Sequence, residues 1–289
     1  MSESALARPP DDVAGTVVAA IRERSRVAPV VAVVLGSGLG ETVRIAGELG
    51  RGREDMELSY ADLPGLPVPS VPGHDGKLWL GDLAGRRAVL FQGRIHSYEA
   101  GMPLASITSQ VAAGLGARTV VLTAAVGAVD PSLPAGALVV VRDHINLMNA
   151  DPLRGWRMPD GSPAFLDLVD VYDDTLSRKA LAAARTHVSG AEGGVPAGLV
   201  TEGIYAAVSG PSFETPAEAE FLRHVGARVV GMSMVPEAVV ARALGLRVVG
   251  LSFVTNRSGT SFSHEDVLMA AKGASEIIAH VIVALMDET

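Results

Sequence analysis

The chain has 289 residues, of which 48% are hydrophobic and 19% are charged, a composition typical of a globular protein with a large core. Its net charge of −8 disfavours nucleic acid as the main partner, because neutralising a phosphate backbone needs a basic face. The sequence contains no cysteine, which excludes disulfides, thiolate nucleophiles and cysteine-ligated zinc sites.

The first residues contain Pro9-Pro10 and Asp11-Asp12 but no apolar segment of the kind that a secretory signal carries. Residues 1–12 are therefore predicted to form a flexible N-terminal tail, followed by one domain over residues 13–289. No apolar run reaches the roughly 20 residues that a membrane-spanning helix needs. We expect a cytoplasmic protein that binds no membrane.

Short apolar runs alternate with helical patterns along the domain. Strands rich in valine and leucine are predicted at Val30–Leu35, Ala88–Gln92, Thr119–Thr123, Ala137–Val141, Leu199–Ala206, Ala227–Val230 and Val248–Phe253. Helices are predicted at Val13–Arg24, Ala105–Leu115, Tyr172–Thr186, Pro216–Val225, Pro236–Leu244 and His264–Met286. This alternation predicts a single α/β domain with a largely parallel sheet.

Capping signals mark several of these helix boundaries. The segment Thr215-Pro216-Ala217-Glu218 is a capping box with proline at the first helical position, and Gly226 and Gly245 are expected to end two helices. Ser263 precedes an acidic first turn, where the helix dipole favours negative charge. The segment Asn149–Phe165 contains several turn signals and is predicted to be a long loop, of the kind that often forms a lid or a contact surface.

A glycine-rich segment, Gly36-Ser37-Gly38-Leu39-Gly40, directly follows the first predicted strand. Glycines let the backbone approach an anion there, and backbone N–H groups and the Ser37 hydroxyl can donate to it. Glu41 occupies the position where the dinucleotide fingerprint needs its third glycine, so an NAD site is disfavoured. A plain strand-to-helix turn remains an alternative.

The segment Gly93–Glu99 follows the second predicted strand. In an extended backbone Arg94, His96 and Tyr98 point to the same side, because side chains alternate with a period of two. Arginine binds phosphate bidentately, and open α/β sheets bind ligands at the carboxyl ends of their strands. The segment predicts an anion site, with a surface salt-bridge patch as the alternative.

Three later segments offer further polar groups at element boundaries. Phe213 is placed to stack on a planar base, and Glu214 is placed to accept hydrogen bonds from the N–H groups of that base. The alternative is that Phe213 is a core residue and Glu214 is solvated. Ser233 suits anion binding near a helix N-terminus, whereas Val235 replaces the glycine that a serine-hydrolase elbow needs. Asn256 has both a donor and an acceptor for one edge of a base, or is simply a turn residue.

The histidines show no pair with zinc-helix spacing, so no metal site is predicted. His144, after Asp143, is expected to be a satisfied core histidine. His187, His224 and His280 are expected on helix surfaces.

Together these segments resemble the trimeric purine nucleoside phosphorylase family over almost the whole chain. Any one of them is weak evidence, but their order and spacing together are specific. The resemblance is carried by Gly36–Gly40, Val71-Pro72-Gly73-His74, Gly93–Glu99, Arg142–Leu147, Gly210–Thr215, Gly231–Glu237, Thr255-Asn256 and Ser263–Leu268.

The resemblance implies roles for individual residues. Its phosphate site comprises Ser37, His74, Arg94, His96, Ser233 and the backbone of Ala125. Its ribose site comprises Tyr98, Met232 and His264, with His264 near the 5′-hydroxyl. Its base site comprises Phe213, Glu214 and Asn256, and the expected catalytic residues are Asn256, Glu214 and His96.

The resemblance also implies a single α/β domain with a central, mixed and distorted sheet flanked by helices, assembled as a homotrimer. An aromatic residue of the neighbouring subunit usually completes the ribose pocket, and Phe165 and Trp156 are the candidates here. No metal or organic cofactor is expected, and inorganic phosphate is a co-substrate.

The pair Glu214 and Asn256 resembles that of the members that cleave inosine and guanosine. A carboxylate accepts from the protonated N1 of a 6-oxopurine, whereas adenine has only an acceptor at N1 and would leave the carboxylate unpaired. Such a mismatch can cost on the order of 10⁴ in selectivity. The expected function is therefore phosphorolysis of 6-oxopurine ribo- or deoxyribonucleosides.

One segment departs from the family pattern. Ala124-Ala125-Val126-Gly127-Ala128 stands where the family usually has Asn-Ala-Ala-Gly-Gly, so an amide side chain is lost and a glycine is replaced. A catalytically impaired nucleoside-binding protein therefore stays open as an alternative, as does a methylthioadenosine phosphorylase. A nucleoside hydrolase is disfavoured because the sequence shows no Asp-rich calcium site.

Overall fold

The computed structural model describes residue 9 and residues 12–190, 199–261 and 264–287; for residues 190 and 264–272 it describes the backbone alone. Most of the predicted N-terminal tail and Ser263 lie outside the described residues. The strands are β1 (Val31–Leu35), β2 (Arg53–Ser59), β3 (Lys77–Leu83), β4 (Arg86–Gln92), β5 (Thr119–Ala128), β6 (Leu138–Asn146), β7 (Val200–Ala207), β8 (Val229–Gly231) and β9 (Arg247–Arg257). The helices are α1 (Val13–Arg24), α2 (Glu41–Leu49), α3 (Ser97–Ala100), α4 (Ile107–Leu115), α5 (Asp174–Gly190), α6 (Pro216–His224), α7 (Met234–Ala243) and α8 (His264–Met286).

The strands form one mixed sheet in the order β2-β3-β4-β1-β5-β8-β7-β6-β9. Strands β4, β1, β5 and β9 run parallel to one another, while β2 and β3 form an antiparallel extension at one edge. Strands β6, β7 and β8 also run parallel to one another, but β8 is antiparallel to β5 and β6 is antiparallel to β9. The mixed sheet is confirmed. Five of the nine strand pairings within the described residues are parallel and four are antiparallel, so the largely parallel sheet predicted from element alternation alone is confirmed only in part.

Strand β5 pairs with β9 along its whole length, but it pairs with β8 only at its last two residues, Gly127 and Ala128. This uneven pairing distorts the sheet. Since β9 also pairs with β6, the strands β5, β8, β7, β6 and β9 close into a ring. The register shifts between Val126 and Gly127 of β5, where Thr255 is an extra residue in β9, and this bulge bends β9 near the point where the ring closes.

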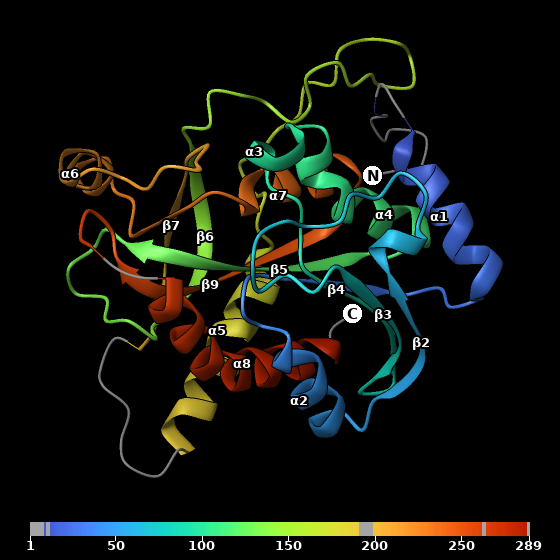
Figure 1. Cartoon of the computed structure of the whole chain (residues 1–289), viewed down its shortest axis with the longest axis horizontal. Coiled ribbons are helices and arrows are strands. Elements are labelled where there is room, and N and C mark those ends of the chain that lie inside the picture. Colours follow the sequence, from blue (N-terminus) through green and yellow to red (C-terminus); the bar gives the residue numbers. More distant parts are fainter. Residues whose placement is uncertain (1–8, 10–11, 191–198, 262–263, 288–289) are drawn as a thin grey trace.

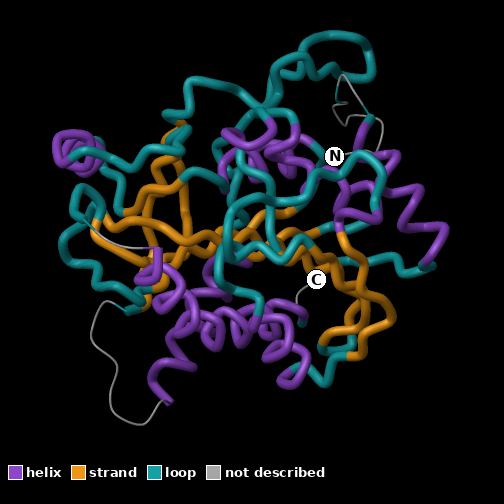
Figure 2. Tube along the Cα trace, in the orientation of Figure 1, coloured by secondary structure: helices purple, strands orange, loops and turns teal. Residues whose placement is uncertain are grey.

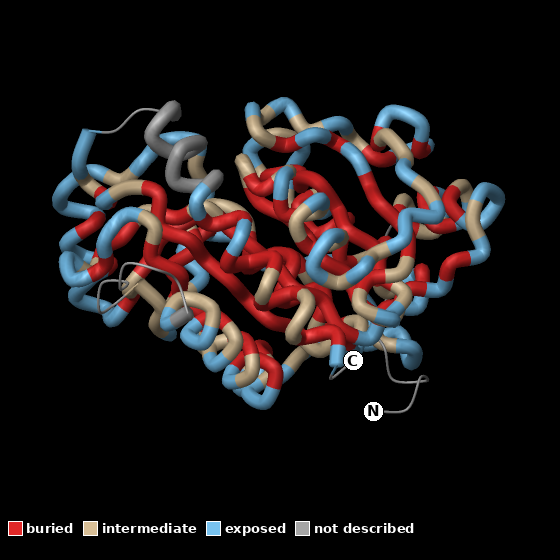
Figure 3. The backbone as a smooth tube through the Cα atoms, turned by 90° about the horizontal axis from the view of Figure 1, so that it is seen from below, coloured by how far each residue is buried: buried red, intermediate tan, exposed pale blue. Residues whose placement is uncertain are grey.

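Helices cover both faces of the sheet (Figures 1 and 2). On one face α1, α4 and α7 bury aliphatic side chains such as Ile21, Val111 and Val239. On the other face α2, α5 and α8 bury Ala46, Leu176 and Ile278. Buried backbone fills the middle of the molecule and exposed backbone its periphery (Figure 3). The central strand β1 is buried at every residue, which fits a strand that is apolar on both faces.

Local signals explain the helix boundaries. The carboxylate of Asp12 accepts from the backbone N–H of Gly15 at 2.8 Å and caps α1. Both bonds of the predicted capping box at Thr215 are present at the start of α6. Gly226 and Gly245 follow the ends of α6 and α7 with φ of 95° and 80°, as expected for C-terminal glycines.

The elements absent from the sequence prediction are β2, β3, α2 and the one-turn α3. Strand β2 is mostly exposed and largely charged, so it lacks the apolar run that identifies a buried strand. Strand β5 continues from the predicted end at Thr123 to Ala128. This extension places the segment that departs from the family pattern inside the sheet and beside the candidate site.

Candidate active site

A cavity of about 170 Å³ lies where β1, β4, β5, β8 and β9 approach one another. Its lining comprises Gly36, Ser37, Val71, His74, Arg94, His96, Tyr98, Ala124, Ala125, Val126, Gly127, Pro211, Phe213, Glu214, Val230, Gly231, Met232, Ser233, Thr255 and Asn256. Every site residue predicted from the sequence is therefore in this cavity except His264. The backbone of His264 begins α8, but its side chain lies outside the described residues.

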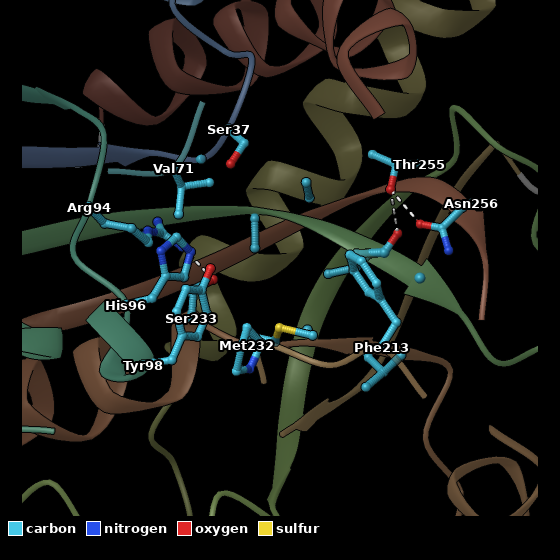
Figure 4. Close-up of a pocket in the computed structure, with 18 of the residues that line it drawn as sticks. Ser37, Val71, Arg94, His96, Tyr98, Phe213, Met232, Ser233, Thr255 and Asn256 are labelled. Atoms are coloured by element: carbon cyan, nitrogen blue, oxygen red, sulfur yellow. Dashed lines mark hydrogen bonds between the residues drawn. The ribbon is translucent and has the colours of Figure 1, made fainter. Parts of the chain in front are cut away.

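The cavity has two polar ends (Figure 4). Ser37, Arg94, His96 and Ser233 gather at one end, and Thr255 and Asn256 lie at the other. Met232 lies between them, so an elongated ligand spanning the cavity would contact different chemistry at each end.

Arg94 is the central cation of the first end and is only 1% exposed. Its Nη1 donates to Ser233 Oγ at 2.9 Å, and its Nη2 donates to the carbonyl of Val34 at 3.3 Å. Its Nε lies 3.4 Å from Oε2 of Glu237, which is completely buried in α7. The guanidinium is thus fixed by groups of its own chain, and its remaining N–H groups can bind an oxyanion.

Glu237 contacts Arg94 of the candidate site but is not among the residues predicted from the sequence. Its Oε1 accepts from Thr108 Oγ1 at 2.7 Å. Burial raises the pKa of Glu237, while Arg94 and the Thr108 hydroxyl act in the opposite direction. The signal in the sequence was a single acid in the otherwise apolar start of α7, because such an acid is rarely buried without a partner.

His74 contacts Ser37 beside the same cation. Ser37 Oγ and His74 Nε2 share a hydrogen bond of 2.9 Å. Gly93 has a φ of 122°, and a Cβ there would come within 2.8 Å of the His74 Cβ, so glycine is needed for this packing. Burial, with the charges of His96 and Arg94, lowers the pKa of His74 to about 3, so its imidazole is neutral near pH 7.

His96 is oriented by Glu99, a second residue that was not assigned a role. Its Nδ1 and backbone N–H both lie 2.8 Å from Glu99 Oε2. Glu99 is partly desolvated, yet hydrogen bonds from Ser70 and His96 lower its pKa to about 2. An ionised carboxylate only accepts, so Nδ1 of His96 carries the proton. Burial lowers the pKa of His96, and its neutral imidazole therefore leaves Nε2 as an acceptor.

Tyr98 shares the cavity with Arg94 and His96, but not for the predicted reason. It lies in helix α3 instead of an extended segment, so the period-two argument is wrong at this residue. Its ring stacks on that of His96 with centroids 4.9 Å apart and planes 10° apart. Burial raises the pKa of the Tyr98 phenol to about 12, so it is a neutral hydrogen-bonding group.

The second end of the cavity combines a carboxylate, an amide and an aromatic ring. Glu214 is half-buried, and its Oε2 accepts from Ser258 Oγ at 2.5 Å. The Asn256 Oδ1 accepts from Thr255 Oγ1 at 2.8 Å, and its Nδ2 donates to the Arg257 carbonyl at 3.3 Å. Phe213 is 64% exposed at the rim, so it is not a core residue.

The segment that departs from the family pattern forms the wall between these ends. Ala124 and Val126 are buried, while Ala125 and Gly127 are partly accessible from the cavity. Ala128 pairs with Val229 of β8 and does not line the cavity. The replaced glycine therefore affects the sheet junction, whereas the lost amide at Ala124 alters the cavity wall itself.

The remaining predictions concern loops and histidines. Trp156 is only 4% exposed and packs against Val240 and Ala243 of its own chain, so it is not presented to a neighbouring subunit. Phe165 is 90% exposed in the same loop. His144 contacts the Tyr172 hydroxyl through Nδ1 at 3.1 Å, so it has a hydrogen-bond partner as predicted, but it is half-buried and not a core residue.

Within the described residues, no cluster of three or more His, Asp or Glu side chains is placed to hold a metal ion. Among the described helices, none combines the length and apolar character needed to cross a bilayer.

The cavity of this α/β fold has a cation and hydroxyls at one end and an acid and an amide at the other. This chemistry suits an anion at the first end and a polar planar group at the second. The family model described as the phosphorylase superfamily matches residues 30–287. Purine nucleoside phosphorylase 1 of Bacillus subtilis is 37% identical over 253 residues, covering 86% of this chain and 88% of the relative. Purine nucleoside phosphorylase of Bos taurus is 39% identical over 269 residues, covering 89% and 88%.

Solved structures show the same fold. Isoform 2 of purine nucleoside phosphorylase from Schistosoma mansoni, in complex with cytosine and ribose-1-phosphate, superposes with a TM-score of 0.82 at 30% identity and covers 95% of both chains. Purine nucleoside phosphorylase of Schistosoma mansoni in complex with adenosine gives 0.81 at 29% identity, covering 95% of this chain and 96% of the other. The chain belongs to the purine nucleoside phosphorylase family.

Proposed function

We propose that this chain catalyses the phosphorolysis of 6-oxopurine nucleosides, such as inosine and guanosine, to the free base and ribose (or deoxyribose) 1-phosphate. The observation that supports this most directly is the two-ended cavity. Arg94, Ser37 and Ser233 offer N–H and O–H donors at one end, while Glu214 and Asn256 offer an acceptor and an amide at the other. The gap between them, lined by Met232 and Tyr98, is the proposed place of the sugar.

In the proposed reaction an oxygen of inorganic phosphate attacks C1′ of the sugar. The bond between C1′ and N9 breaks, its electron pair passes to the purine, and the base then takes a proton from solvent. The fixed guanidinium of Arg94 holds the anion, and His74 and the backbone of Ala125 complete the proposed phosphate site. The neutral His96, whose Nε2 is an acceptor, suits the remaining proton of the phosphate.

Asn256 is proposed to stabilise the negative charge that develops on the purine. Its Oδ1 is occupied by Thr255, and one of its two Nδ2 hydrogens is used by Arg257. The second hydrogen is left to donate to N7 or O6 of the base. An interaction that strengthens as charge develops lowers the barrier rather than merely binding substrate.

The preference for 6-oxopurines rests on Glu214. As a carboxylate it accepts from N1–H of hypoxanthine or guanine, and adenine has no hydrogen at N1. Phe213, exposed at the rim, is proposed to cover the base, and His264 to contact the 5′-hydroxyl. Methylthioadenosine phosphorolysis is the alternative for the same phosphate site, and the adenosine complex of a related protein makes it worth testing.

We further propose a cytoplasmic homotrimer that needs no metal or organic cofactor. Phe165, which is exposed on its loop, is the candidate for completing the ribose pocket of a neighbouring subunit.

The experiment is an assay of base release from inosine, guanosine, adenosine and methylthioadenosine, each with and without phosphate. Strict phosphate dependence with inosine and guanosine supports the proposal. Release without phosphate would indicate a hydrolase, a preference for methylthioadenosine would indicate the alternative phosphorylase, and no release from any substrate would indicate a binding protein.

A further inference from the structure

The loop that follows β9 carries a serine, Ser258, directly against the proposed base-binding acid. Its hydroxyl donates to Glu214 Oε2 at 2.5 Å, and the serine itself is only 6% exposed. This is a short hydrogen bond, at the lower end of the range for a hydroxyl donor. Ser258 does not line the cavity, so it acts on a ligand only through Glu214.

The backbone around Ser258 is built to hold this contact. The N–H of Ser258 donates to the carbonyl of Ala128 at 2.8 Å, which continues the pairing of β9 with β5. At Gly127 of β5, a Cβ would come within 3.2 Å of the Ser258 Cβ and 3.5 Å of Asn256 Nδ2. Glycine at this position leaves room for both side chains.

The next residue, Gly259, brings the loop against the start of helix α6. It has a φ of 73°, and a Cβ there would lie 3.0 Å from the Ala219 Cβ and 3.1 Å from the Pro216 Cα. Glu214 lies just before α6, whose first residue is Pro216, so this close approach sets the distance between Ser258 and the carboxylate. The contact therefore depends on the folded backbone rather than on a chance rotamer at the surface.

We propose that Ser258 is a positioning residue that fixes Glu214 as a hydrogen-bond acceptor and thereby sets the preference for 6-oxopurines over 6-aminopurines. A hydroxyl has a single hydrogen, and Ser258 uses it on Oε2, which leaves Oε1 for the base. To accommodate adenine, Glu214 has to turn its acceptor oxygen away from N1. The bond from Ser258 opposes this turn, because it holds the carboxylate in one orientation. This inference rests on the proposed base-binding role of Glu214.

The test compares the ratio of kcat/KM for inosine and adenosine, at saturating phosphate, in the wild-type protein and in Ser258→Ala. Loss of a hydrogen bond to a charged group is expected to lower this ratio about tenfold or more, mainly through inosine. Ser258→Thr keeps the hydroxyl and is expected to retain most of the preference. The dissociation constants of hypoxanthine and adenine, measured by calorimetry with phosphate present, give the same comparison where adenosine turnover is too slow to follow.

Thr260→Ala is the matched control. Thr260 is an exposed residue of the same loop whose hydroxyl donates to the Arg257 carbonyl at 2.7 Å, so the variant loses a loop hydrogen bond without touching Glu214. A general loosening of the loop would lower the ratio equally in Thr260→Ala and Ser258→Ala, and that result would overturn the inference. An unchanged ratio in Ser258→Ala would overturn it as well. The KM for phosphate is expected to stay within about twofold in all three variants, because none of the substitutions is at the anion end.

Glu214→Gln separates this inference from the proposed function. If Glu214→Gln leaves inosine turnover and the ratio unchanged, the base-binding role of Glu214 fails and the inference fails with it. If Glu214→Gln lowers inosine turnover while Ser258→Ala keeps the wild-type ratio, the proposed function stands and only the positioning role of Ser258 is refuted.

Discussion

The buried pair of Glu237 and Arg94 gives a prediction whose size follows from the structure. The side chains are 0% and 2% exposed, and Glu237 Oε2 lies 3.4 Å from Arg94 Nε. At an effective dielectric constant of about 20, two unit charges at that distance attract by about 5 kcal/mol. Substituting Glu237→Ala leaves Arg94 buried without its counter-charge, and such losses cost about 3–5 kcal/mol.

We expect Glu237→Ala to lower the free energy of unfolding by about 3–5 kcal/mol, a large share of the stability of an ordinary domain. Urea unfolding followed by circular dichroism measures this loss. Glu48→Gln is the matched control, because Glu48 pairs with Arg44 at 2.7 Å on the exposed face of α2 and such surface pairs contribute less than about 1 kcal/mol. A loss in Glu237→Ala no larger than that of the control would refute the reasoning.

The pair also has a functional readout. Phosphate that binds only the folded state raises the unfolding temperature. If Glu237 holds Arg94 in place, the phosphate-dependent increase in unfolding temperature is expected to shrink in Glu237→Ala. An increase equal to that of the wild-type protein would show that Arg94 keeps its position without Glu237.

Further predictions address the rest of the site. Asn256→Ala is expected to lower kcat for inosine by about 100-fold or more, because a donor to the developing charge is lost; an unchanged kcat in steady-state assays would exclude that role. Arg94→Gln is expected to raise the KM for phosphate by more than about tenfold while Glu48→Gln leaves it unchanged, as phosphate titrations would test. Because the pKa of Glu99 is lowered to about 2, its ionised form adds stability above about pH 5 that is lost as the pH falls toward 2. Glu99→Gln should remove this contribution, so acid titrations of the wild-type protein and the variant should converge only as the pH falls to about 2, and parallel curves would contradict it. Dialysis against EDTA should leave activity unchanged, since the proposed reaction uses no metal, and activity restored only by an added divalent ion would contradict that.

Much of the fold could be predicted from the sequence because its central strands and long helices have strong local signals. The buried strand at Val31–Leu35 and the capping box at Thr215 are recognisable from a few consecutive residues. Strand β2 is not, because its charged residues are held in the sheet by pairing with β3. The closure of β5 with both β8 and β9 also depends on long-range pairing that no local pattern records.

The residues of the candidate site also divide into those with a local sequence signal and those that only long-range contacts reveal. Arg94, Ser233 and Asn256 come just after strands or near their ends, where polar residues in short motifs stand out. Glu237 contacts Arg94 and is itself contacted by Thr108, while Ser258 contacts Glu214. These partners lie on other elements, so the contacts appear only when the distances are known. Tyr98 was assigned to the right cavity through an incorrect backbone conformation, because a one-turn helix after His96 has no periodicity to detect.

The central claim is that an anion and a purine base occupy opposite ends of one cavity. A crystal structure of the protein with hypoxanthine and phosphate tests it most directly. We expect Arg94 and Ser233 within hydrogen-bond distance of the phosphate, with Glu214 and Asn256 on the rim of the base. Phosphate bound away from Arg94, or a base with Glu214 and Asn256 turned from it, would contradict the claim.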